Sequence, residues 1–134
     1  MNFTSIEQSK KLLELGIDKY TCDLIHRKRD CGDSYIVIVP RTNDGLLYNL
    51  NYFDERSDDI PCWSTGALID LLPKIIVNNN HNYYLDIDVN SAMPVYSYSN
   101  FDHYLYGFPN DLLGGDLISN LIKCIEWLKE HKYM

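Results

Sequence analysis

The stretch that decides the fold is residues 83–108, YYLDIDVNSAMPVYSYSNFDHYLYGF. Its first part places an apolar or aromatic side chain at every second position, with Tyr84, Asp86 and Asp88 between them. This period of two predicts a half-buried strand over residues 83–89. Tyrosine-rich segments at 95–99 and 103–108 predict two further strands. Because short turns join the three segments, an antiparallel meander is the simplest topology.

Helical patterns lie on both sides of this meander. Apolar residues at helical spacing predict helices over residues 6–15, 19–26, about 61–72 and 116–131. Thr4 and Ser5 precede Glu7 and Gln8 in capping-box positions, and Ser64 or Thr65 is placed to cap the third helix before Pro73 ends it. We also expect Asp18 to cap the second helix and Trp63 to pack in the core.

Two more strands complete the predicted order. Residues 34–40 are β-branched and end at Pro40, and residues 46–50 are expected to return as their hairpin partner after the turn Asn43-Asp44-Gly45. The segments 51–60 and 78–82 are expected to be loops. The order ααββαβββα predicts one single α+β domain over residues 1–134, a mostly antiparallel sheet with helices packed on one face.

Composition narrows the function classes. The chain has 134 residues and a formal net charge of −7, which disfavours a nucleic-acid or anionic-membrane binder. Its apolar stretches fall far short of the ~20 residues of a membrane span, and residues 1–9 hold no signal-peptide core. We therefore expect a cytoplasmic protein with reduced cysteines, although the basic run Arg27-Lys28-Arg29 leaves nucleic-acid binding as a third alternative.

Three patches of the chain carry a resemblance to a known group. They are Ile60-Pro61-Cys62-Trp63-Ser64-Thr65-Gly66-Ala67-Leu68-Ile69-Asp70-Leu71-Leu72-Pro73, the segment 7–16 and the segment 117–133. The first resembles the Pro-x-Trp-Ser segment, ending in Leu-Pro, of small uncharacterised proteins of Bacteroidetes and their phages or prophages. It departs from that pattern at Thr65-Gly66. The resemblance implies a mobile-element origin and transfers no catalytic residue.

Two residue sets raise the alternative of a metal-binding protein or an enzyme. Cys22 and His26 have the i, i+4 spacing that can hold zinc, with Cys31 and Cys62 as further ligands. Asp86 and Asp88 place two carboxylates on one strand face, where they could bind Mg²⁺ or act as acid and base. Neither set has the context of a common motif, so we expect no metal, no cofactor and no catalytic residue.

The meander favours a different role. No Lys or Arg occurs between Lys74 and Lys123, an interval that holds five aspartates and a formal charge of −5. The interval also carries the candidate interaction surface Tyr84, Asp86, Asp88, Tyr96, Tyr98, Tyr104 and Tyr106. Tyrosine is enriched at protein interfaces, although cross-strand packing and plain solubility would also account for this composition.

These observations predict a small acidic, non-enzymatic protein-interaction or accessory protein. Its partner is expected to be a protein, basic in character, because an acidic sheet attracts basic surfaces. A mimic of DNA that inhibits a basic DNA-binding protein is a narrower version of the same hypothesis. Neither nucleic acid nor membrane is expected as a partner, and self-association through a sheet edge or the Trp127 side of the last helix is left open.

Overall fold

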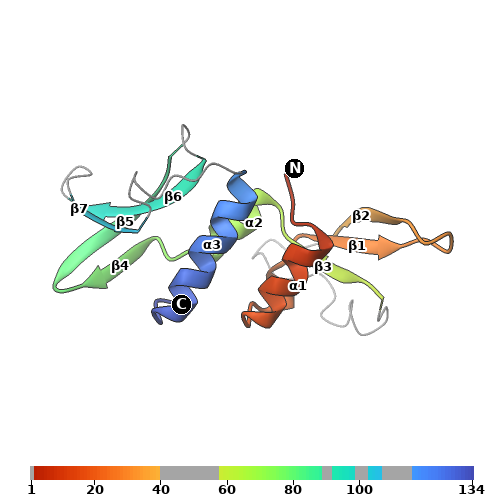
Figure 1. Ribbon diagram of the computed structural model, residues 1–134, viewed down its shortest axis with the longest axis horizontal. Helices are drawn as coiled ribbons and strands as arrows, with labels where there is room; N and C mark the ends of the chain where they lie inside the picture. The colour runs from red at the N-terminus through yellow and green to blue at the C-terminus, as the bar shows by residue number, and fades with distance from the viewer. Residues whose placement is uncertain (1, 40–57, 89–91, 99–102, 107–115) are drawn as a thin grey trace. The chain divides into compact units, whose positions relative to one another are not determined.

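The computed structural model describes residues 2–39, 58–88, 92–98, 103–106 and 116–134. These residues form α-helices and two antiparallel sheets, which confirms the α+β class (Figure 1). The chain divides into two compact units, residues 1–68 and 69–134, so that the division falls within one short helix, α2 (Thr65–Leu71). The organisation as one single domain stays a prediction.

The first unit holds a three-stranded sheet and one α-helix. Its elements are α1 (Ile6–Glu14), the 3-10 turn η1 (Lys19–Thr21), β1 (Leu24–Lys28), β2 (Ser34–Ile38) and β3 (Ile60–Cys62), with strand order β2-β1-β3. The predicted capping box is present, because the Ser5 side chain accepts from the Gln8 N–H while the Gln8 side chain accepts from the Ser5 N–H. Helix α1 packs on β3, and Leu12, Ile25 and Trp63 are buried.

The predicted second helix, over residues 19–26, is wrong. Asp18 does cap a turn, since its side chain accepts from the Tyr20 N–H, but the turn ends after three residues. From Leu24 the chain is β1, paired with β2 on one side and β3 on the other. Pairing on both edges satisfies the backbone groups of β1 and overrides the weak helical spacing of its side chains.

The second unit is a four-stranded antiparallel sheet with one long helix. Its elements are β4 (Ile75–Asn78), β5 (His81–Asp88), β6 (Met93–Tyr98), β7 (His103–Tyr106) and α3 (Leu117–Glu130), with strand order β4-β5-β6-β7. The expected meander is therefore confirmed, and α3 packs on β6. Six residues of α3 are buried along the apolar stripe that predicted the helix, and Asp116 caps its first turn.

Several predicted details differ from the structure. The strands form two sheets rather than one, and the expected order of elements along the chain lacked the strands β1, β3 and β4. The segment expected to open a helix at Pro61 is instead β3, an edge strand where proline is tolerated. The helix begins only at Thr65, and the Ser64 side chain caps it by accepting a hydrogen bond from the Ala67 N–H. The expected strand 46–50 and the turn at 43–45 lie outside the described residues. Within the described ranges, no helix is long and apolar enough to cross a membrane.

Candidate functional site

Strand register divides the four-stranded sheet into two faces. Residues that lie directly opposite in an antiparallel pair point to the same face. Leu85 lies opposite Tyr96, and Tyr96 lies opposite Tyr106, whose ring meets Trp127 of α3 at 5.0 Å. We name this side the α3 face. On the other side, Tyr84 lies opposite both Ile75 of β4 and Ser97 of β6.

The seven candidate interaction residues therefore do not form one surface. Tyr96, Tyr98 and Tyr106 belong to the α3 face. Tyr84, Asp86 and Asp88 lie on the opposite face, as does Tyr104, which is opposite Ser97. A bulge between Tyr96 and Ser97 shifts the β7 register, so that Tyr104 and Tyr106 separate although they are two residues apart.

The individual side chains differ in exposure. Tyr96 is completely buried, and its hydroxyl donates a 2.7 Å hydrogen bond to the carbonyl of Pro73. Burial raises the pKa of Tyr96 well above its ordinary value, so its hydroxyl stays protonated. Tyr98, Tyr104 and Tyr106 are half-buried. Tyr84 is more than half exposed and is the one candidate tyrosine whose ring is mainly available to a partner.

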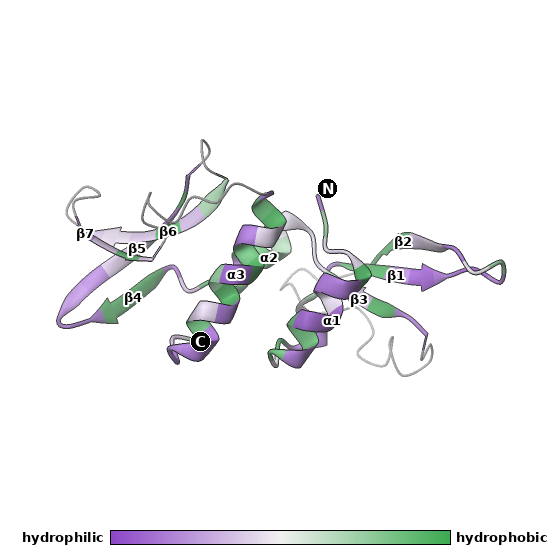
Figure 2. Ribbon diagram, viewed as in Figure 1, coloured by the Kyte–Doolittle hydropathy of each residue, from purple (hydrophilic) through white to green (hydrophobic). Residues whose placement is uncertain are grey.

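Tyr84 belongs to an exposed apolar patch that the sequence reasoning missed. Ile75 and Val77 of β4 are exposed by 50% and 66%, and Tyr84 of β5 is exposed by 53%. Ile75 lies directly opposite Tyr84, and Asp86 follows Tyr84 by two residues on the same face and is also exposed. We call these four residues the β4–β5 patch. In Figure 2, β4 is coloured mainly as a hydrophobic strand.

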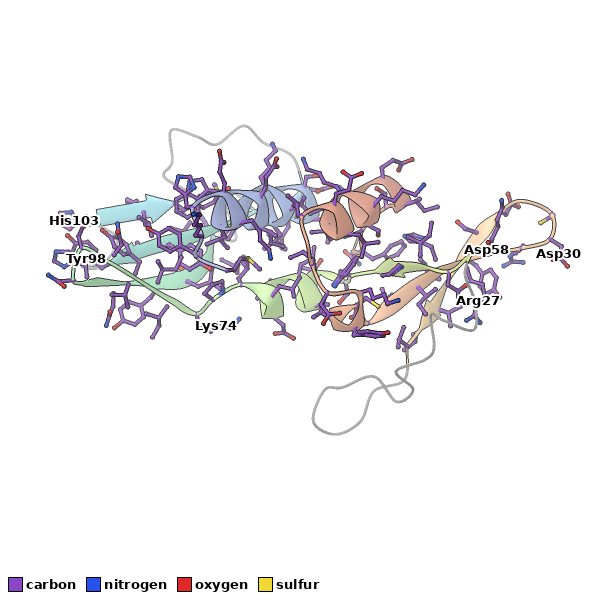
Figure 3. All side chains as sticks on the ribbon, turned by 90° about the horizontal axis from the view of Figure 1, so that it is seen from below. Arg27, Asp30, Asp58, Lys74, Tyr98 and His103 are labelled. Carbon is purple, nitrogen blue, oxygen red and sulfur yellow. The ribbon has the colours of Figure 1, made fainter. Side chains whose placement is uncertain are left out.

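A ladder of stacked rings crosses three strands on the α3 face. His81 and His103 lie on the two sides of the Tyr98 ring, each with a centroid separation of 4.5 Å and with planes within 4° and 11° of parallel. Tyr83 meets Tyr98 edge-on at 4.9 Å. Figure 3 shows Tyr98 and His103 together at this end of the sheet. These contacts fasten β5, β6 and β7 to one another, so Tyr98 has a structural role.

Of the four proposed metal ligands, the structure brings His26 and Cys62 to one carbonyl oxygen but does not gather a full set of ligands. His26 Nε2 lies 2.8 Å from the Thr4 carbonyl oxygen, and the Cys62 thiol donates to the same oxygen at 3.4 Å. Cys22 is buried, whereas Cys31 is exposed between β1 and β2, where it contacts Asp33. Among the described residues, no group of three or more His, Cys, Asp or Glu side chains is arranged to hold a metal ion.

The buried thiols are poorly suited to nucleophilic chemistry. Burial raises the pKa of Cys62 to about 11, and burial raises the pKa of Cys124 to about 12. Both thiols are therefore protonated at neutral pH, whereas the thiolate is the reactive form. Asp86 and Asp88 share a strand face, but Asp86 is exposed and Asp88 is half-buried.

The basic run is partly engaged within the first unit. Arg27 forms a half-buried ion pair with Asp59 at 3.0 Å, with two hydrogen bonds to its two carboxylate oxygens. The Arg29 guanidinium lies 4.7 Å from the centre of the Tyr35 ring. Both arginines therefore have intramolecular partners that a phosphate backbone would have to displace.

Comparisons with known proteins do not assign the chain to a family. No protein-family model matches the chain, and neither a curated protein nor a solved structure matches it significantly.

Proposed function

We propose that this is a non-enzymatic interaction protein that binds a basic segment of another protein on the β4–β5 patch. The observation that carries the proposal is the exposure of Ile75, Val77 and Tyr84 side by side on one sheet face. Three large apolar side chains exposed together, with a polar rim, are typical of a protein-binding surface. Single exposed apolar residues would need no such explanation.

The charge around the patch supports a basic partner. Asp86 lies beside Tyr84 on the patch, and Asp88 follows on the same face. The sequence from residue 75 to residue 122 contains five aspartates and neither lysine nor arginine. A basic side chain docked near Tyr84 therefore meets carboxylates without a competing cation from this stretch, which favours both attraction and correct orientation.

Tyr84 is the expected energetic anchor. A tyrosine ring provides a large rigid contact area and keeps its hydroxyl available to water or to a partner. Tyrosine is enriched among the residues that dominate binding energy, whereas exposed aspartates at the rim contribute mainly to the association rate and its salt dependence. Loss of Tyr84 should therefore weaken binding more than loss of the Asp86 charge.

A library of random short peptides displayed on phage tests the proposal. The protein is expected to select peptides that combine apolar residues with Lys or Arg, and a selected synthetic peptide then serves as the probe in fluorescence anisotropy. Tyr84→Ser should weaken its affinity about ten-fold or more, which corresponds to about 1.4 kcal/mol. Asp86→Asn should reduce the salt dependence of binding.

The matched control is Tyr35→Ser, because Tyr35 is also an exposed tyrosine on a strand, in the other sheet. Its affinity for the selected peptide should equal that of the unmodified protein. Selection of acidic peptides, selection without any preference for basic residues, or equal binding by the Tyr84→Ser variant would each contradict the proposal.

A further inference from the structure

The outer edge of β4 offers backbone groups to a further strand. Strand β4 ends the order β4-β5-β6-β7, and no strand in the described part of the chain pairs with its other side. The turn Asn79-Asn80 closes the β4–β5 hairpin with φ values of 50° and 65°, the conformation of a two-residue type I′ turn. Such a turn fixes the register of the hairpin without a bulge.

The hydrogen-bond pattern identifies which residues point outward. The Leu85 N–H donates to the Lys74 carbonyl at 3.0 Å, and Leu85 lies opposite Lys74 by the register of the hairpin. Hydrogen-bonded pairs alternate along an antiparallel ladder, so Ile76 bonds to β5 while its two neighbours do not. Ile75 and Val77 therefore direct their N–H and C=O groups away from β5, toward the open edge.

This pattern is complementary to itself. When two copies of β4 run antiparallel about a two-fold axis, Ile75 of one copy can lie opposite Val77 of the other, with Ile76 on the axis. The outward N–H and C=O groups of both residues then face their counterparts, so the register forms two hydrogen-bonded pairs. A shift by one residue would instead place outward groups opposite inward ones.

The side chains suit the same register. Ile75 and Val77 are both exposed on the face of the β4–β5 patch, so the pairing places an isoleucine beside a valine twice. Residues 75–85 contain no Lys, Arg, Asp or Glu, and the register sets Lys74 opposite Asn78 of the second copy. This register therefore sets no pair of like charges directly opposite along β4, and Lys74 lies at the start of the strand (Figure 3).

We propose that the β4 edge pairs with the β4 edge of a second copy of this chain, forming a continuous antiparallel sheet across a two-fold dimer. The contact is short, since β4 has four residues, and it covers less than the ~1,200–2,000 Å² of a standard stable interface. The dimer should therefore dissociate on dilution. Each copy carries a net charge of −7, so added salt should strengthen the association by screening repulsion.

Sedimentation velocity over a range of concentrations tests the proposal. The unmodified protein should show a weight-average sedimentation coefficient that rises with concentration toward that of a dimer. Val77→Lys should weaken the association about ten-fold or more, because lysine on an edge strand opposes pairing. Ile38→Lys is the matched control, since Ile38 is 77% exposed on β2, an edge strand of the other sheet, and it should leave the association unchanged.

A monomer at every concentration, or a loss of association in Ile38→Lys but not in Val77→Lys, would overturn the proposal. A selected basic peptide that alone occupies the β4 edge of a monomer would overturn it as well. Circular dichroism checks that Val77→Lys is folded, and Ile75→Lys repeats the test should Val77→Lys fail to fold. Failure of the dimer can be told apart from failure of the proposed peptide binding, because salt should strengthen the dimer and weaken binding of a basic peptide.

Cysteine cross-linking tests the register itself. Variants Ile75→Cys and Val77→Cys are prepared on a Cys31→Ser background, because Cys31 is exposed. A mixture of the two should form disulfide-linked dimers faster than either variant alone. Faster cross-linking in either single variant than in the mixture would exclude the antiparallel register described here.

Discussion

The hydroxyl of Tyr96 donates a 2.7 Å hydrogen bond to the main-chain carbonyl of Pro73. Tyr96 lies on β6 and is completely buried, and Pro73 precedes β4, the edge strand of the same sheet. The bond thus satisfies a carbonyl next to the strand that carries much of the β4–β5 patch. Tyr96 supports the candidate site from within the second unit and is not itself a contact residue.

Tyr96→Phe should therefore lower stability without lowering affinity. The substitution leaves the Pro73 carbonyl without this donor, which we expect to reduce the free energy of unfolding by about 1–2 kcal/mol. Urea denaturation followed by circular dichroism measures the loss, and anisotropy with the selected basic peptide measures affinity. Unchanged stability would show that water replaces the hydroxyl. If the Tyr96→Phe variant is fully folded and still binds the peptide more weakly, Tyr96 would belong to the binding surface, contrary to its burial.

Thr4 provides a second test, in the first unit. Its hydroxyl accepts from the Trp63 N–H at 3.1 Å and lies 2.7 Å from the Ser9 hydroxyl, and Thr4 and Ser9 are fully buried. Thr4→Val should cost about 2–4 kcal/mol of unfolding free energy, because two buried polar groups lose a partner. Thr4→Ser keeps the hydroxyl and should cost about 1 kcal/mol, since it removes one methyl group. Equal losses in thermal or urea unfolding would mean that packing, and not hydrogen bonding, explains the role of Thr4.

The cysteines should differ sharply in reactivity. Cys31 is exposed, whereas Cys22, Cys62 and Cys124 are buried, and burial raises the pKa of Cys62 to about 11 and that of Cys124 to about 12. Native protein treated with iodoacetamide near pH 8 should therefore be labelled first and mainly at Cys31, as read by mass spectrometry of its peptides. Labelling of all four should require denaturant. Rapid labelling of Cys62 in the native protein would contradict the burial of this thiol.

Asp116 should give α3 a measurable acid sensitivity. Its carboxylate accepts from the Ser119 N–H at 2.7 Å, and this bond holds the pKa of Asp116 below its ordinary value. The folded state therefore favours the charged form, so this stabilisation is present above the unfolded pKa of about 3.9 and is lost as pH falls through the lower folded value. Asp116→Ala should cost about 1 kcal/mol near neutral pH.

Asp116→Asn separates the cap from the charge. Asparagine retains an acceptor for the Ser119 N–H, so stability near neutral pH should fall by less than in the alanine variant. Its unfolding free energy should also lack the part of the acid dependence that Asp116 contributes. An alanine variant as stable as the unmodified protein would show that this cap does not stabilise α3.

The long helices were predictable because local signals agreed with the tertiary structure. The stripe of α3 and the capping box of α1 determine both their bounds and their buried faces. By contrast, residues 24–28 have side chains compatible with either helix or strand. These residues form a strand because they pair with β2 and with β3, and β3 lies more than 30 residues further along the chain.

The candidate site was predicted in part. The alternation of residues 83–88 correctly separates Tyr84 and Asp86 from Leu85 and Ile87. The faces of the later tyrosines depend on the bulge beside Tyr96, which no local pattern reveals. Strand β4 was missed although the run Ile75-Ile76-Val77 is β-branched and follows a helix-ending proline, a signal that could have identified it.

The most direct test of the central claim is the affinity of Tyr84→Ser for the selected basic peptide, measured beside the unmodified protein and Tyr35→Ser at low and high salt. The unmodified protein and Tyr35→Ser should bind equally, salt should weaken both, and Tyr84→Ser should bind about ten-fold more weakly or not at all. Equal affinity of all three proteins would contradict the claim that the β4–β5 patch is the binding surface.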